Sequence, residues 1–138
     1  MTSPTIWVER ADKGRRIGAV VLALFALSKA GLWFALGYPI ALHIEFIAHV
    51  LPDWAWVAVW IFAGAICLAG TFSQRLFRWG TGLVGGLSFI WGVGYVTVGL
   101  VIPDAFGSAV CYLAMAGMAA MTTVFSSLLP SRMRGLYG

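Results

Sequence analysis

Hydrophobic residues form four long runs along the chain, separated by short polar segments. The runs cover residues 17–38, 54–72, 76–102 and 106–129. A helix needs about 20 apolar residues to cross the hydrocarbon core of a bilayer, and each run is close to that length. The alternating pattern of a membrane β-strand is absent, and backbone groups in lipid must bond internally. The pattern therefore predicts an all-α, polytopic, integral membrane four-helix bundle.

The segments between the runs carry helix-breaking residues. Pro39 follows the first run, and "LPDW" opens the second with Asp53 as its predicted N-cap. The breaks "TFSQRLFRWG" and "IPDAFG" are short, so consecutive helices should pair as antiparallel neighbours. The segment "PIALHIEFIAHVLP" is apolar but too short to span. It predicts a short helix that lies in the interface or dips back into the bundle.

The polar N-terminal segment precedes an apolar run that is longer than the core of a signal peptide, and no A-x-A cleavage site follows it. We therefore expect a first helix that is retained. The predicted organisation is a basic segment over residues 1–16, a transmembrane domain over 17–129 and a basic tail over 130–138.

Basic residues lie on one side of the predicted bundle, with Lys29 as the exception. They are Arg10, Lys13, Arg15, Arg16, Arg75, Arg78, Arg132 and Arg134. The two connections on the other side carry Glu45, Asp53 and Asp104 and no Lys or Arg. The positive-inside rule then predicts a multi-pass protein of the bacterial inner membrane with both termini in the cytoplasm.

The composition supports a membrane protein, and the absence of catalytic motifs argues against an enzyme. Hydrophobic residues make up 61% of the chain and charged residues 10%, against about 45–50% and about 25% in soluble domains. The sequence has no Ser/His/Asp set, no phosphate-binding loop and no acid/base pair, so we predict no enzyme, no catalytic residue and no cofactor. The basic clusters flank helices and suit anionic lipid rather than nucleic acid.

The predicted topology places the two cysteines at different depths. Cys67 and Cys111 should differ in depth by about 12 Å, which is too far for a disulfide, so both are predicted to be apolar fillers.

The aromatic residues are predicted to have two roles. Trp91 lies in mid-span, where a packing role is expected. The remaining Trp and Tyr residues near the ends of the runs predict interfacial anchors. They are Tyr38, Trp54, Trp56 and Tyr112 at the outer boundary and Trp79 at the inner one.

Lys29 stands inside the first apolar run, where a lysine at the centre of a helix costs about 2.5–3.5 kcal/mol on insertion scales. Two interpretations remain open. The ammonium group snorkels to the outer headgroups, or it faces the bundle interior and pairs with Glu45. Glu45 and His49 are four residues apart and would share one face of a short helix.

The spacing of His43, Glu45 and His49 is poor for a metal site. His43 and Glu45 are two residues apart, about 200° around a helix, so only Glu45 and His49 could chelate from one face. We predict no metal here. A proton-sensitive patch is favoured, because histidine titrates between about pH 5 and 8.

The third apolar run contains the small-residue segment "GTGLVGGLSFIWGVGYVTVG". Gly82 and Gly86 form a GxxxG pair, and Gly85, Ser88, Gly92 and Gly99 recur at spacings that place them on one face. Small residues let membrane helices approach closely. Packing within the bundle explains such residues, and a subunit interface is the alternative. Two small faces on one helix can serve both, so we predict a homo-oligomer.

The layout resembles small four-span, holin-like membrane proteins of actinobacterial phages. The resemblance rests on "IWVERADKGRRIGAVVLAL", the arrangement of the spans and the basic tail "SRMRG". The segment "VWIFAGAICLAGTFSQRLFRWG" is similar to the second helix and turn of DoxX-like four-helix membrane proteins. Neither family supplies a motif that assigns functional residues.

Two function classes follow from these observations. The resemblance to holin-like proteins implies oligomerisation in the inner membrane and permeabilisation of it. The alternative is a non-enzymatic interaction protein that docks onto a host or phage membrane partner, as in superinfection exclusion or as an accessory subunit. A small-molecule pocket lined by Trp33, Trp60 and Trp91 is a third idea, without a specific signal in the sequence.

Overall fold

The computed structural model describes residues 4–36 and 50–134, and this part of the chain is helical. Its helices are α1 (Pro4–Leu36), α3 (Asp53–Ala69), α4 (Gln74–Gly99) and α5 (Ala105–Arg134). Three of them contain segments long and apolar enough to cross a membrane, while α3, with 17 residues, is shorter. The prediction of an all-α chain with membrane-spanning helices is confirmed at this level, and insertion and orientation stay predictions.

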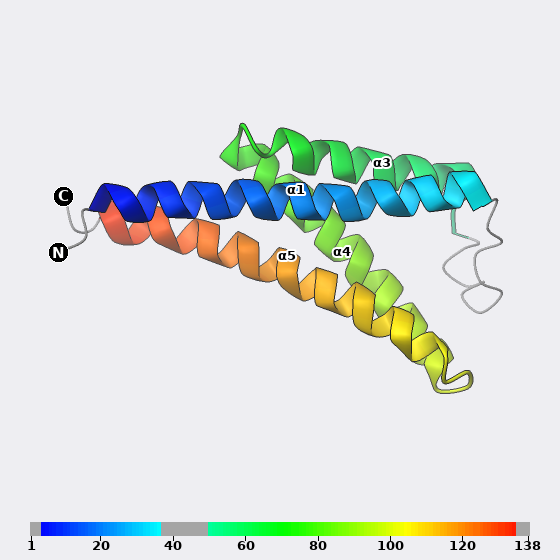
Figure 1. Cartoon of the computed structure of the whole chain (residues 1–138). Helices are drawn as coiled ribbons and strands as arrows, with labels where there is room; N and C mark the ends of the chain where they lie inside the picture. The colour runs from blue at the N-terminus through cyan, green and yellow to red at the C-terminus, as the bar shows by residue number, and fades with distance from the viewer. Residues whose placement is uncertain (1–3, 37–49, 135–138) are drawn as a thin grey trace.

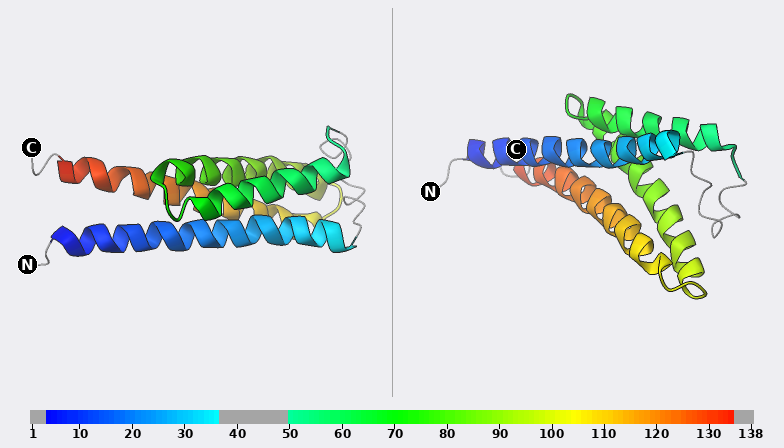
Figure 2. Two further views of the ribbon diagram at one scale, coloured as in Figure 1. Left: turned by 90° about the horizontal axis from the view of Figure 1, so that it is seen from above. Right: turned by 45° about the vertical axis from the view of Figure 1, so that its right-hand side comes forward.

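The helices pair as two antiparallel hairpins, α1 with α3 and α4 with α5 (Figure 1). The largest interface joins α4 to α5, and the next joins α1 to α3. α1 and α5 approach each other where Gly18 faces Thr122, and they spread apart toward the end where α5 begins (Figure 1, and Figure 2, right). The two hairpins are joined mainly by α3 against α4 and less extensively by α1 against α5.

α1 starts at Pro4, so the helix that contains the first apolar run also includes most of the basic segment predicted over residues 1–16. Proline is well tolerated in the first turn, where its missing N–H would have no helical partner. Asp12 accepts hydrogen bonds from Arg15 and Arg16, three and four residues further on, which supports the helix here. The predicted short helix after the first span lies outside the described residues.

The start of α3 differs from the prediction by one residue. Asp53 is the first helical residue, and Pro52 is the N-cap, with no side-chain cap hydrogen bond. The carbonyl of Pro52 accepts hydrogen bonds from the backbone N–H groups of Ala55 and Trp56. The expected N-cap role of Asp53 is therefore wrong, and its carboxylate acts on the helix dipole from the first turn.

The backbones of α3 and α4 approach each other closely near the α3–α4 turn. A Cβ on Gly80 would lie 2.7 Å from the backbone N and Cα of Cys67. A Cβ on Gly70, just after α3, would lie 2.6 Å from the Cα of Phe77. Only glycine permits this backbone-to-backbone approach.

Arg15 joins α1 to the same turn. Its guanidinium donates hydrogen bonds to the carbonyls of Gly70 and Thr71 and lies 5.9 Å from the centre of the Phe77 ring. These carbonyls follow the last turn of α3, where carbonyls lack helical partners. A residue expected only to orient the protein is therefore also a structural contact between helices.

The aromatic residues predicted to lie at the membrane interface fall into an exposed group and a buried group. Trp54 and Trp79 are 74% and 66% exposed, as an anchor would be, and Trp91 is buried as expected. Trp56 and Tyr112 are only 6% and 5% exposed, so their prediction as anchors is wrong. Two residues after Trp54, Trp56 lies on the opposite side of α3 and faces the other helices. Tyr38 lies outside the described residues.

The two cysteines are free, and they differ in environment. Cys67 is buried against Gly80, which fits the predicted filler role. Cys111 is exposed on α5, so the same prediction is wrong for that residue. Exposure of Cys111 follows from its neighbour Tyr112, which occupies the inward-facing position on this turn.

Candidate functional site

A cluster of aromatic side chains fills the space where the four helices meet around Lys29. We call it the aromatic cluster. It consists of Phe25 and Trp33 from α1, Trp56 and Trp60 from α3, Trp91 and Tyr95 from α4, and Tyr112 from α5.

Helical periodicity explains how these side chains converge. Phe25, Lys29 and Trp33 follow one another at intervals of four residues and therefore share a face of α1. α3 and α4 each contribute an aromatic pair with the same spacing, Trp56 with Trp60 and Trp91 with Tyr95. This repeated i, i+4 aromatic spacing is a signal in the sequence that could have identified the cluster.

Trp91 and Tyr112 are the centre of the cluster. Trp33 and Trp56 each meet the Trp91 ring edge-on, with centroids 5.4 and 5.3 Å away. Tyr112 stacks on Trp91 at 6.2 Å and on Tyr95 at 5.5 Å. Such pairs contribute about 0.5–1.5 kcal/mol each beyond the area they bury. The rings therefore join both hairpins where α1 and α5 are spreading apart.

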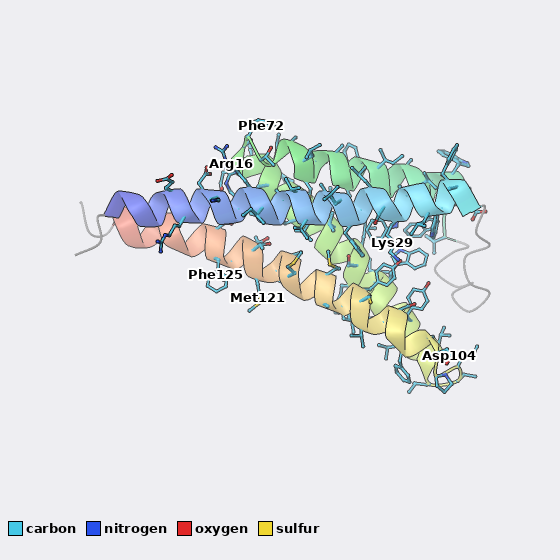
Figure 3. The ribbon with its side chains drawn as sticks, in the orientation of Figure 1. Arg16, Lys29, Phe72, Asp104, Met121 and Phe125 are labelled. Atoms are coloured by element: carbon cyan, nitrogen blue, oxygen red, sulfur yellow. The ribbon has the colours of Figure 1, made fainter. Side chains whose placement is uncertain are left out.

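Lys29 is half-buried beside these rings, on the half of α1 away from the N-terminus (Figure 3). Its Nζ atom lies 4.5 Å from the centre of the Tyr112 ring and 5.8 Å from that of Phe25. For a half-buried pair, a cation–π contact of this kind contributes about 1 kcal/mol. The ring faces therefore give the ammonium group a favourable contact on the otherwise apolar side of α1.

In the described part of the chain, Lys29 has no carboxylate partner. Asp12 pairs with Arg15 and Arg16, and none of the side chains that the structure describes places a carboxylate within ion-pair distance of Lys29. His43, Glu45 and His49 lie outside the described residues, so pairing with Glu45 stays a prediction. The described residues also hold no group of three potential metal ligands.

Two further polar atoms on α4 are buried without a hydrogen-bond partner among the described residues, Ser88 Oγ and Trp91 Nε1. A buried group left without a partner costs about 1–3 kcal/mol. The indole belongs to the aromatic cluster, and the serine lies one turn before it on the same helix. What the described cluster offers chemically is hydrogen-bond donors, a cation and ring faces.

The six small residues of α4 that the sequence analysis identified divide into two faces with opposite surroundings. A Cβ on Gly85 would lie 3.0 Å from Ala119 Cβ, and one on Gly92 2.7 Å from Leu113 Cδ2. Ser88 and Gly99 are buried in the same direction. We call this set, Gly85, Ser88, Gly92 and Gly99, the inner face; it packs mainly against α5.

The outer face of α4, defined by Gly82 and Gly86, is open. A Cβ on either residue would have no atom within 4 Å, and both residues are exposed. The six small residues singled out in the sequence are thus one packed set and one pair without a packing partner in the protomer.

Comparison of the chain with protein-family models, with curated proteins and with solved structures gives no match. The similarity to holin-like and DoxX-like proteins therefore stays a resemblance in layout.

Proposed function

We propose that this chain is a non-enzymatic protein of the bacterial inner membrane that self-associates and permeabilises the membrane in the manner of holin-like proteins. The observation that carries the proposal is the outer face of α4, where Gly82 and Gly86 are exposed with nothing packed on them. In lipid, close packing of small-residue faces is a principal source of helix association.

The surroundings of the outer face suit a second copy of the chain. Phe89, Ile90 and Val93 continue along the same side of α4 and are exposed. These larger side chains would flank a helix seated on the two glycines. Positive-inside orientation gives every copy the same direction, so α4 helices of two copies would meet in parallel about an axis normal to the membrane.

Inducible expression in bacteria with a membrane-impermeant dye tests this function. We expect abrupt dye entry after a delay, followed by cell death. Gly86→Leu should block the outer face and abolish dye entry at equal protein abundance. The matched control is Gly117→Leu, since Gly117 is also an exposed helical glycine with nothing near its Cβ position. Dye entry that is unchanged in Gly86→Leu would contradict the proposal.

A second function, docking onto another membrane protein, is favoured by the enclosure of Lys29. The ammonium group contacts Phe25 and Tyr112 rather than an open polar face. The large exposed side chains of the four helices are predominantly hydrophobic, which suits contact with lipid or with a partner helix. Intact cells that contain abundant inserted protein would favour this accessory function.

Lys29→Leu separates the two functions further. If the lysine contributes to permeabilisation, the variant should change the timing or extent of dye entry. If the protein docks onto a partner, the variant should change only stability or partner binding. Equal dye entry from the wild type and Lys29→Leu would remove the lysine from the permeabilising mechanism.

A further inference from the structure

A basic and aromatic patch lies on the surface at the start of α4, apart from the aromatic cluster. We call it the turn patch and define it by Phe72, Arg75, Arg78 and Trp79. Phe72 and Trp79 are 89% and 66% exposed, and both arginines are exposed. Figure 3 shows Phe72 at the α3–α4 turn, pointing away from the other helices.

The two arginines of the turn patch differ from the basic residues of α1 beside them. Arg15 and Arg16 are both engaged by the Asp12 carboxylate. For Arg75 and Arg78 the described part of the chain supplies no carboxylate within ion-pair distance. Arg75 is three residues before Arg78 and four before Trp79, so the three side chains share one side of the helix.

We infer that the turn patch binds the headgroup of an anionic phospholipid. Two guanidinium groups on one helix face supply a fork of donors matched to phosphate oxygens. The first turn of α4 adds free backbone N–H groups and the positive end of the helix dipole to the same region. The exposed Phe72 and Trp79 place apolar and amphipathic rings at the level where headgroups meet acyl chains.

Charge complementarity selects this occupant over a second copy of the chain. Direct contact between the turn patches of two copies would bring arginine against arginine, which is unfavourable. Arg75 lies seven residues before Gly82, on the same side of α4 as the outer face, so in parallel copies joined there an anionic headgroup would separate the arginines. An anionic headgroup neutralises both arginines, and each basic residue near an anionic surface strengthens binding about fivefold. The patch is at the end of the bundle that the positive-inside rule assigns to the cytoplasmic leaflet.

Native mass spectrometry of the protein purified in a neutral detergent tests this site. Phosphatidylglycerol and phosphatidylcholine with identical acyl chains are added, and the first bound lipid is quantified. We expect about 25-fold tighter binding of phosphatidylglycerol, because two basic contacts of about fivefold each multiply. Arg75→Gln/Arg78→Gln should reduce that preference to less than about twofold.

The control variant is Lys13→Gln/Arg16→Gln, which removes the same amount of charge from the neighbouring surface of α1. It should keep the preference for phosphatidylglycerol, and the thermal unfolding of both variants should match that of the wild type. Two results would overturn the inference. One is a wild type without any preference, and the other is an equal loss in both double variants, which would indicate diffuse attraction rather than a site.

Discussion

The inner and outer faces of α4 carry the same residue type at similar spacing, yet their surroundings are opposite. On the inner face, a Cβ on Gly92 would meet Leu113 at 2.7 Å, whereas on the outer face one on Gly86 would meet nothing within 4 Å. The inner face is therefore already used for packing within the protomer. The outer face keeps the property that membrane helices use for association, a surface that another backbone can approach.

This difference shows that a small-residue motif does not reveal its role by itself. Its role depends on which helix, if any, packs against it. The GxxxG pair Gly82 and Gly86 is the more recognisable motif, but it makes no contact in the protomer. The less regular set of Gly85, Ser88, Gly92 and Gly99 holds α4 against α5. Single methyl groups added to α4, and single contacts removed, should therefore have very different effects on stability at different positions.

The largest effect is expected at Gly80, where α4 touches α3. Gly80→Ala places a Cβ 2.7 Å from the Cys67 backbone, and neither backbone can rotate away. We expect the free energy of unfolding in mixed micelles to fall by about 3 kcal/mol, the upper end for overpacking. Gly82→Ala is the control, and equal stability of the two variants would refute the close α3–α4 contact.

A moderate effect is expected on the inner face. In Gly92→Ala the new methyl group meets the side chain of Leu113, which can adjust more readily than a backbone. The free energy of unfolding should fall by about 1–2 kcal/mol. Denaturant titration of this variant and of Gly80→Ala compares the two losses of unfolding free energy. A larger loss in Gly92→Ala would mean that the α4–α5 contact is tighter than the α3–α4 contact.

The contact of Lys29 with the Tyr112 ring should contribute less to the free energy of unfolding. A double-mutant cycle of Lys29→Met and Tyr112→Leu should give a coupling energy of about 1 kcal/mol, as a cation–π contact would. The control cycle pairs Lys29→Met with Phe72→Leu, which lies at the α3–α4 turn. Additive effects in the first cycle would show that the ring does not stabilise the cation.

The smallest effect on folding is expected on the outer face. Gly86→Ala meets no atom within 4 Å, and alanine is the better helix former by about 1 kcal/mol. Thermal unfolding should be unchanged or slightly higher. A clear loss of stability in the monomeric protein would mean that the outer face is packed after all, and the contrast between the two faces would disappear.

Much of the fold was predictable from the sequence, because lipid requires long apolar helices with internal backbone hydrogen bonds. The positions of the helices and their antiparallel order followed from run length and from short connections. The burial of Trp56 and Tyr112 was missed, because residues near the end of a span are read as interfacial. Trp56 faces inward because it shares one side of α3 with Trp60, and Tyr112 faces inward because it stacks on Trp91 and Tyr95.

The environment of Lys29 was only partly predictable. The sequence left two interpretations open, an ammonium group that snorkels outward and one that pairs with Glu45, whereas the structure places the rings of Phe25 and Tyr112 beside it. Arg15 was interpreted by its charge alone, because contacts with carbonyls some 55 residues further along the chain depend on how α1 packs against the turn. Which glycines of α4 pack and which stay open likewise depends on the placement of α5.

Disulfide crosslinking in membranes tests most directly whether the outer face of α4 joins two copies. Phe89→Cys places a thiol about one turn after Gly86 on the same side of α4, and Cys111→Ser removes the exposed native thiol. The control in the same background is Val124→Cys, an exposed position on α5. Mild oxidation should give a covalent dimer with Phe89→Cys and little with Val124→Cys. Monomer alone from Phe89→Cys, or equal dimer from both positions, would contradict self-association through this face.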